Sequence, residues 1–129
     1  MNKEWYHALE APPLTPPDAV FAPVWTVLYV MIAAALLLWS RSRDQFLPHR
    51  TWKLIALHLL ANAAWYPFFF GLRSPLLGLA DLAVMWLTLL ILLPRFWRES
   101  RLSFHLLLPY TFWLAFATYL NAGFWWLNR

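Results

Sequence analysis

The feature that most constrains the fold is a set of four long apolar segments, each close to the length that crosses a lipid bilayer. They cover residues 18–40, 51–70, 75–94 and 103–127. A helix needs about 20 mainly apolar residues to cross roughly 30 Å of hydrocarbon. Hydrophobic residues make up 62% of the 129 residues and charged residues 12%, and a soluble domain this small could not bury so much apolar surface. The sequence therefore predicts one domain over residues 1–129, an all-α integral membrane protein folded as a four-helix transmembrane bundle.

Local signals predict where these helices begin and bend. Asp18 is expected to cap the first helix and Thr51 the second, while Pro75 suits the first turn of the third. Pro67 and Pro109 lie inside the second and fourth segments, where we expect kinks or terminal turns. Because the connectors are short, helices that follow one another in the chain are expected to pack antiparallel.

The N-terminal segment MNKEWYHALEAPPLTPPD carries acids and prolines where a signal peptide would have its apolar stretch. We therefore expect the later apolar segments to direct membrane insertion. The chain contains no cysteine, which excludes disulfides and thiolate chemistry.

The basic residues predict the orientation in the membrane. Seven of the ten Lys and Arg residues lie in the connectors 41–53 and 95–101. The positive-inside rule therefore predicts that both connectors are cytoplasmic and that the N-terminal segment faces outward. Helical spans with basic loops suit a bacterial inner membrane, and the net charge of +4 reflects topology rather than nucleic-acid binding.

Three aromatic-rich blocks stand out from the apolar background. They are WYHALEAPPLTPPDAVFAPVWTVLY at 5–29, ANAAWYPFFFGL at 61–72 and LPYTFWLAFATYLNAGFWWLN at 108–128. Large rings with a polar atom at one end line membrane interfaces, and they also line pockets for flat hydrophobic ligands. Both interpretations predict a position near the ends or the interior of the bundle.

Polar side chains within the spans are candidates for ligand contact or for contacts between helices. Asp81 is expected to face the bundle and to find a structural partner, although a relay or ligand role is also open. His58 and Asn62 share one helix face and are expected to meet a ligand edge, and a lone His58 is weak support for haem iron. On the last helix, a second stripe follows helical spacing and consists of Tyr110, Trp113, Ala117 and Asn121.

The three blocks resemble a known membrane family. The pattern WY-x-A-L-x-x-P-x-x-TPP-x-x-x-F-x-PVW-x-x-LY at 5–29 is similar to the signature of the TspO/MBR family, which includes tryptophan-rich sensory proteins and the translocator protein, or peripheral benzodiazepine receptor. N-x-x-W-x-P-x-FF-G-L at 62–72 and LPY-x-x-W-x-x-FA-T-x-LN at 108–121 resemble its later blocks, and Asp81 matches an acid between them.

The resemblance implies a pocket near the loop before the first helix, which in the family binds porphyrin or haem, sterols and benzodiazepine-type ligands. The implied pocket residues are Tyr6, Trp25, Tyr29, Asn62, Phe69, Trp113 and Ala117. The family has five spans, one of them ahead of the WY motif, so we expect that first helix to be missing. His58 stands where the family leads us to expect an amide, and it adds a titratable group beside the pocket.

These observations favour a membrane receptor or carrier for flat lipophilic ligands, with a regulatory, sensory role in tetrapyrrole or stress responses. Two alternatives stay open, a structural or assembly protein without a ligand and an enzyme that degrades porphyrin. No catalytic or metal motif is present, so we expect a binding protein rather than an enzyme, with no required cofactor and no metal. The expected partners are membrane lipid, a porphyrin, haem or sterol-like molecule and a second copy in a homodimer, but no nucleic acid.

Overall fold

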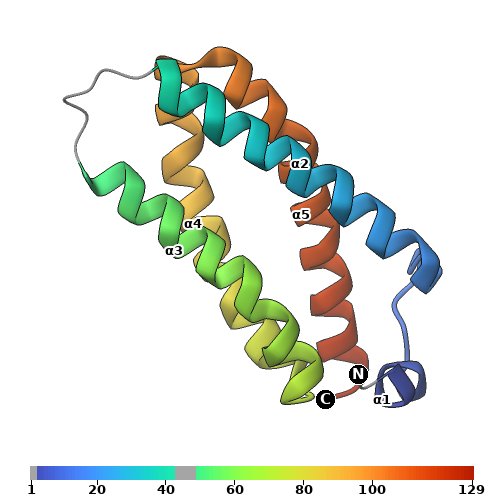
Figure 1. Cartoon of the computed structure of the whole chain (residues 1–129). Coiled ribbons are helices and arrows are strands. Elements are labelled where there is room, and N and C mark those ends of the chain that lie inside the picture. The colour runs from blue at the N-terminus through green and yellow to red at the C-terminus, as the bar shows by residue number, and fades with distance from the viewer. Residues whose placement is uncertain (1–2, 43–48) are drawn as a thin grey trace.

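The computed structural model describes residues 3–42 and 49–129, and within these ranges the chain is helical without strands (Figure 1). The elements are α1 (Lys3–Ala8), α2 (Asp18–Ser42), α3 (His49–Tyr66), the π-helix η1 (Pro67–Gly71), α4 (Pro75–Glu99) and α5 (Arg101–Leu127). The predicted all-α fold with four long helices is confirmed. Residues 43–48 of the basic connector lie outside the described residues, so its predicted orientation stays a prediction.

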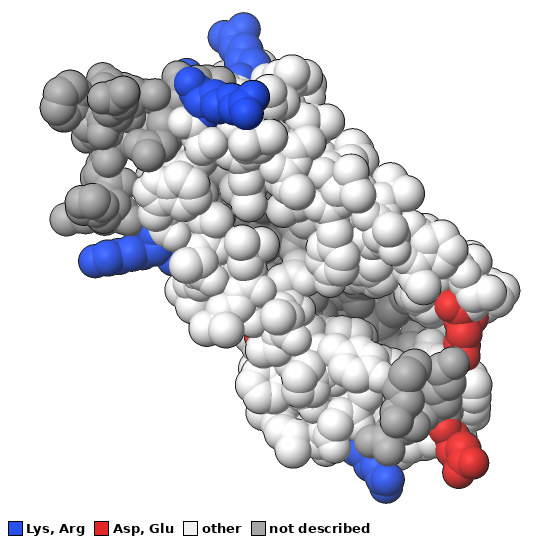
Figure 2. All heavy atoms as spheres, viewed as in Figure 1, with Lys and Arg blue, Asp and Glu red and all other residues white. Residues whose placement is uncertain are grey.

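Three helices in the described part of the chain are long and apolar enough to cross a membrane. They are Asp18–Arg41, Thr51–Gly71 and Pro75–Glu99. The fourth predicted span, α5, has 27 residues and is long enough, but its Tyr, Trp and Asn side chains lower its mean hydropathy. Charged side chains lie mainly at the two ends of the face in Figure 2, separated by a broad uncharged band. This distribution suits a protein whose middle lies in hydrocarbon.

Two of the predicted helix caps are wrong. Asp18 is the first residue of α2 rather than its cap, and its carboxylate contacts the ring of His7 at 2.7 Å. Thr51 lies inside α3, since that helix begins two residues earlier. Its buried hydroxyl accepts a 2.8 Å hydrogen bond from the Arg95 guanidinium of α4. In both cases the side chain contacts a residue distant in the sequence and does not cap its own helix.

The prolines have different effects in the different helices. Pro67 opens the π-helical turn η1, the terminal distortion that the sequence predicts for α3. The third predicted helix was expected to end near Pro94, but α4 continues through it to Glu99. Because the following residues are good helix formers, the end comes only where Ser100 turns to an extended backbone and caps α5 by accepting a hydrogen bond from Ser103.

The packing order of the helices differs from their order in the chain. α3 packs on α4, α4 on α5, and α5 on α2 (Figure 1). The prediction that sequence neighbours pack is therefore wrong for α2 and α3, which approach each other through long side chains. The rings of Trp39 and Trp52 meet at 4.8 Å near the connector, and Tyr29 reaches Asn62 farther along. Because α2 and α3 stand at the two ends of this packing order, space is left between them.

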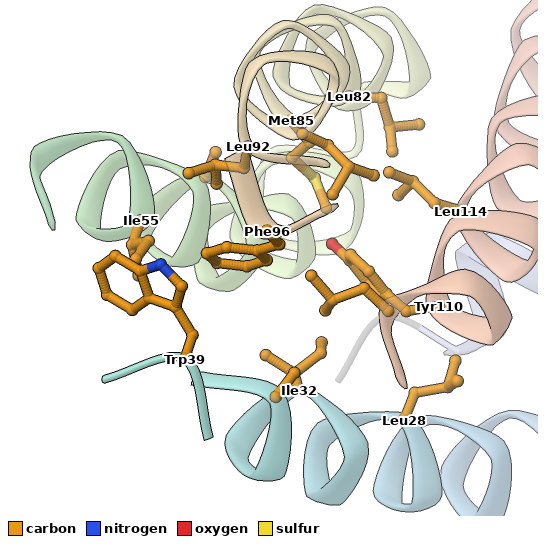
Figure 3. Close-up of a cluster of buried hydrophobic side chains, with 14 residues drawn as sticks. Leu28, Ile32, Trp39, Ile55, Leu82, Met85, Leu92, Phe96, Tyr110 and Leu114 are labelled. Atoms are coloured by element: carbon orange, nitrogen blue, oxygen red, sulfur yellow. The ribbon is translucent and has the colours of Figure 1, made fainter. Parts of the chain in front are cut away.

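The solid part of the core lies at the connector end of the bundle. Trp39 and Phe96 are almost fully buried there, and they lie in one cluster with Ile32 and Ile55 from the neighbouring helices (Figure 3). Each large apolar side chain buried in this way stabilises the bundle through many weak dispersion contacts with its neighbours. This end therefore fixes the four helices relative to one another.

Residues 3–17, which we call the N-terminal strap, cross the opposite end of the bundle. The amide of Asn128, at the end of α5, makes two 2.8 Å hydrogen bonds with the Glu10 backbone. The Tyr119 hydroxyl donates to the Pro13 carbonyl at 2.7 Å, and Pro12 lies directly against Gly123. Trp5 packs edge-on against Phe69 of η1. These contacts hold the strap over the end of the bundle that the core does not fill.

Candidate functional site

A cavity of about 410 Å³ lies in the half of the bundle next to the strap. Its wall comes from α1, α2, α3, η1, α4 and α5, so every described helix contributes to it. Figure 2 shows the surface hollowed between the part of the molecule that α2 forms and the part that α3 forms. The volume is within the range of pockets that bind small organic ligands.

The structure brings seven of the predicted ligand-binding residues together around this cavity. They are Tyr6, Trp25, Tyr29, Asn62, Phe69, Trp113 and Ala117. Asn121, which the sequence predicts as a structural polar residue, also reaches the wall. These residues come from α1, α2, α3, η1 and α5, and so they meet only in the folded bundle. The eighth predicted contact, His58, is not among the lining residues.

Aromatic rings form two walls of the cavity. On one side, the rings of Trp25 and Tyr29 lie 5.5 Å apart, and Trp113 meets Trp25 edge-on at 6.3 Å. On the other side, the rings of Trp65 and Phe69 stack at 4.9 Å with an interplanar angle of 23°. Flat faces on two sides of one space suit a flat ligand, because rings stack with little loss of side-chain entropy.

The polar atoms at the cavity are few, and most are already engaged. The Tyr29 hydroxyl donates to the Asn62 carbonyl oxygen at 3.0 Å. Trp65 Nε1 donates to the Asn121 carbonyl oxygen at 2.8 Å, and the Asn121 amide donates to the Pro75 carbonyl at 2.7 Å. Asn121 therefore joins α3, α4 and α5 through its side-chain amide.

Trp113 is the exception among these polar groups. Its indole nitrogen is buried and has no hydrogen-bond partner among the described residues. A buried donor without a partner lowers stability by roughly 1–3 kcal/mol. The ring of Trp113 lines the largely apolar cavity, while its nitrogen is closed to solvent.

His58 lies behind the cavity wall, in the core. It is 5% exposed, and its ring nitrogens contact Tyr110, Thr88 and the Met85 carbonyl. The expectation that His58 meets a ligand directly is therefore not met in this structure, because other helices occupy both nitrogens. It remains linked to the cavity through Tyr110 and Asn62.

Asp81 is buried on α4 away from the cavity lining. Its exposed fraction is 6%, and its Oδ2 atom has no hydrogen-bond partner among the described residues. The sequence predicts an interhelical partner for this carboxylate, and the structure supplies none for that oxygen. The physical reason is the composition of its surroundings, since the core of α4 and its neighbours is almost entirely apolar.

The cavity carries little charge. Among its lining residues Asp18 carries the one carboxylate, and none is Lys or Arg. Asp18 contacts His7 at the strap, and burial together with the Asp18 charge raises the pKa of the nearby Tyr6 phenol above its ordinary value. No group of three His, Asp or Glu side chains suited to a metal ion occurs within residues 3–42 and 49–129. The wall of the cavity is thus mostly apolar and aromatic, with few charged groups.

Sequence reasoning missed several aromatic residues of the wall. They are Phe21, Tyr66, Phe70 and Phe124. Their spacing carried a signal, because Phe21 is one helical turn from Trp25, and Phe124 follows Asn121 at helical spacing on α5. Phe70 adjoins Phe69 in η1, where the wide π-turn brings consecutive rings to the same region.

The chain resembles known proteins over nearly its whole length. The model of the TspO/MBR family matches residues 1–127. The chain is 37% identical to a tryptophan-rich protein TspO of Chlorobaculum tepidum, over 91% of this chain and 75% of that protein. It is 35% identical to a translocator protein of Ovis aries, over 97% of this chain and 75% of that protein, and 33% identical to a translocator protein homolog of Schizosaccharomyces pombe, over 95% and 77%.

Proposed function

The chain belongs to the TspO/MBR family of integral membrane proteins, and on that premise we propose that it is a receptor or carrier for a flat lipophilic ligand, of the porphyrin or sterol-like class. The observation that carries the proposal is the aromatic cavity of about 410 Å³ between the helices. Its two ring walls and its scarcity of charge match a ligand that is flat and mostly apolar.

The chemistry of the wall separates the two ligand classes. A sterol-like molecule brings one polar group and no charge, which suits a wall without Lys or Arg. A porphyrin brings two carboxylates, which would meet the Asp18 carboxylate unless they project out of the cavity. We therefore propose that a porphyrin binds with its rings between Trp25 and Trp65 and with its carboxylates directed outward.

A sensory or carrier role is supported by the position of the strap. Tyr6 of the strap lines the cavity, and its ring lies 5.5 Å from Phe70 and 5.1 Å from Phe124. A ligand that occupies this space therefore touches a segment held by a few exposed hydrogen bonds, and such segments change conformation at low free-energy cost. This coupling supports a proposal in which ligand binding alters the outer face of the protein.

The test is a tryptophan-fluorescence titration of the purified protein with protoporphyrin IX and with its dimethyl ester. Trp25→Phe and Trp113→Phe are the test variants. Trp97→Phe, whose ring is exposed near the other end of α4, is the matched control. We expect saturable quenching at about one ligand per chain, weakened about tenfold by either cavity substitution and unchanged by the control. The dimethyl ester should bind at least as tightly as the free acid.

Two results would contradict the proposal. Linear quenching that is the same in all variants would mean that porphyrin only dissolves in the micelle, and a membrane assembly role would then fit better. Loss of the porphyrin absorption band that depends on light, oxygen and Trp25 would indicate the enzyme alternative. Corrections for inner-filter absorption and a titration of empty micelles are required for either conclusion.

A further inference from the structure

One chain of hydrogen bonds runs from the cavity into the core and crosses all four long helices. The Tyr29 hydroxyl of α2 lies 3.0 Å from the Asn62 carbonyl oxygen of α3. The Asn62 amide nitrogen lies 2.8 Å from the Tyr110 hydroxyl of α5, and that hydroxyl lies 2.7 Å from His58 Nε2. This chain of hydrogen bonds begins at Tyr29, a half-exposed residue of the cavity wall, and ends at the buried His58.

The inner end of the chain fixes which nitrogen of His58 carries the proton. His58 Nδ1 lies 3.1 Å from the Met85 carbonyl oxygen, which can only accept, so Nδ1 must be the protonated nitrogen. The Thr88 hydroxyl, 2.8 Å from Nδ1, donates within its own helix to the Val84 and Met85 carbonyls, at 3.0 and 2.9 Å, and accepts from the ring. No carboxylate contacts either ring nitrogen among the described residues, which leaves a buried imidazole neutral. Nε2 is then a pure acceptor.

This assignment determines the direction of every other bond. Because Nε2 only accepts, the Tyr110 hydroxyl donates to it, and the Tyr110 oxygen can then only accept from Asn62. The Asn62 amide must therefore turn its nitrogen to Tyr110 and its oxygen to Tyr29. Tyr29 in turn donates its only hydroxyl proton to Asn62. All the bonds point from the cavity toward the core.

We propose that His58 is a positioning residue that sets the hydrogen-bond preference of the ligand cavity through Tyr110 and Asn62. Since the Tyr29 proton is committed inward, the Tyr29 oxygen presents only lone pairs to the cavity. The site accordingly prefers a ligand that donates a hydrogen bond at this edge, such as a sterol-type alcohol, over the matching ketone. This inference rests on the proposed ligand-binding function.

Removing the acceptor at position 58 should reverse the donor–acceptor direction of the hydrogen bonds between Tyr110, Asn62 and Tyr29. In His58→Leu, the Tyr110 hydroxyl has no ring nitrogen to donate to, and it can donate to the Asn62 oxygen once the amide rotates. The Asn62 nitrogen then donates to Tyr29, and the Tyr29 proton becomes available to the cavity. His58→Gln is the conservative control, because its amide donates to the Met85 carbonyl and accepts from Tyr110, which preserves the direction.

The binding test uses cholestanol and cholestanone, which differ only in a hydroxyl or carbonyl at one carbon. Dissociation constants are measured for the wild type, His58→Gln and His58→Leu, each with and without Tyr29→Phe. We expect the wild type and His58→Gln to prefer the alcohol by about tenfold, and His58→Leu to lose or invert that preference. Tyr29→Phe should abolish the preference in every background.

A second measurement does not depend on any ligand. Nitrogen-15 NMR of protein labelled at histidine, with His58→Gln to identify the resonance, reports which ring nitrogen is protonated. We expect the Nδ1–H form, with a change at Nε2 in Tyr110→Phe. The Nε2–H form would overturn the inference, as would equal affinities for both ligands in the wild type. If neither sterol binds while the Nδ1–H form is found, the sterol branch of the proposed function fails and the inferred polarity stands.

Discussion

Trp65 of α3 donates a 2.8 Å hydrogen bond to Asn121 of α5 directly above Gly78 of α4. The contact joins two helices across a third at the floor of the cavity. A Cβ atom at position 78 would lie 2.5 Å from the Asn121 oxygen and 3.1 Å from the Trp65 nitrogen. The absence of a side chain at Gly78 is what lets the three helices meet here.

Gly78→Ala should therefore break this contact. We expect a loss of about 1–3 kcal/mol in the free energy of unfolding, from the forced displacement and the unpaired polar atoms. Thermal unfolding in detergent measures the effect. Gly71→Ala is the matched control, because the nearest atom to its added Cβ is 4.0 Å away. Equal melting temperatures for the two variants would contradict the close approach at Gly78.

Asp81→Asn should leave stability unchanged or raise it. A buried carboxylate oxygen without a partner is costly, and a neutral amide of the same shape costs less, so we expect a gain of up to about 2 kcal/mol. The same melting assay tests this, with the exposed Glu4→Gln as a control for charge alone. A clear drop in the melting temperature would show that Asp81 has a partner that the structure lacks.

Asn128→Ala should release the N-terminal strap. The substitution removes both hydrogen bonds to the Glu10 backbone and leaves the bundle core intact. We expect amide hydrogen exchange at Glu10 to accelerate about tenfold, with unchanged exchange in α4. Thr26→Ala, which loses only a bond to its own helix at Ala22, serves as the control. Unaltered exchange at Glu10 would mean that packing alone holds the strap.

Ser103→Ala should weaken the contact between α5 and α2. The buried Ser103 hydroxyl donates to the Ala35 carbonyl at 2.6 Å, and its loss should lower stability by about 1 kcal/mol. Ser40→Ala is a close comparison, because within the described part of the chain the Ser40 hydroxyl bonds only to its own helix, at Leu37. If the two variants have the same melting temperature, the interhelical hydrogen bond contributes nothing measurable to stability.

The sequence predicts the parts of this structure that depend on local pattern. The four long helices follow from apolar length, and the lining residues Trp25 and Asn62 follow from motifs that keep their order along the chain. An amide on an apolar helix needs a partner, and Asn121 has two, in the Trp65 indole and the Pro75 carbonyl. Each of these predictions needs only residues that lie within about two helical turns of one another or within one motif.

The remaining features depend on residues far apart in the chain. Asp18 contacts His7 and Thr51 contacts Arg95, so neither side chain caps the helix end that the sequence predicts. His58 is placed in the core by Tyr110 and by α4, although its spacing with Asn62 suggested the cavity. No spacing rule indicates that α2 packs on α5, because that choice is made by the summed burial of whole helix faces.

The space between α2 and α3 determines which ligand concentration controls the occupancy of the cavity. Tyr29 lines the cavity and is 50% exposed, and its helix α2 is long and apolar enough to cross a membrane, so that lipid would border the opening beside it. A lipophilic ligand concentrates in the bilayer before it meets such an entrance. The quantity that governs saturation is then the mole fraction of ligand in lipid, set by its partition coefficient. Doubling the vesicle concentration at a fixed total amount of ligand would dilute the bound state, although neither the cavity nor the aqueous volume has changed.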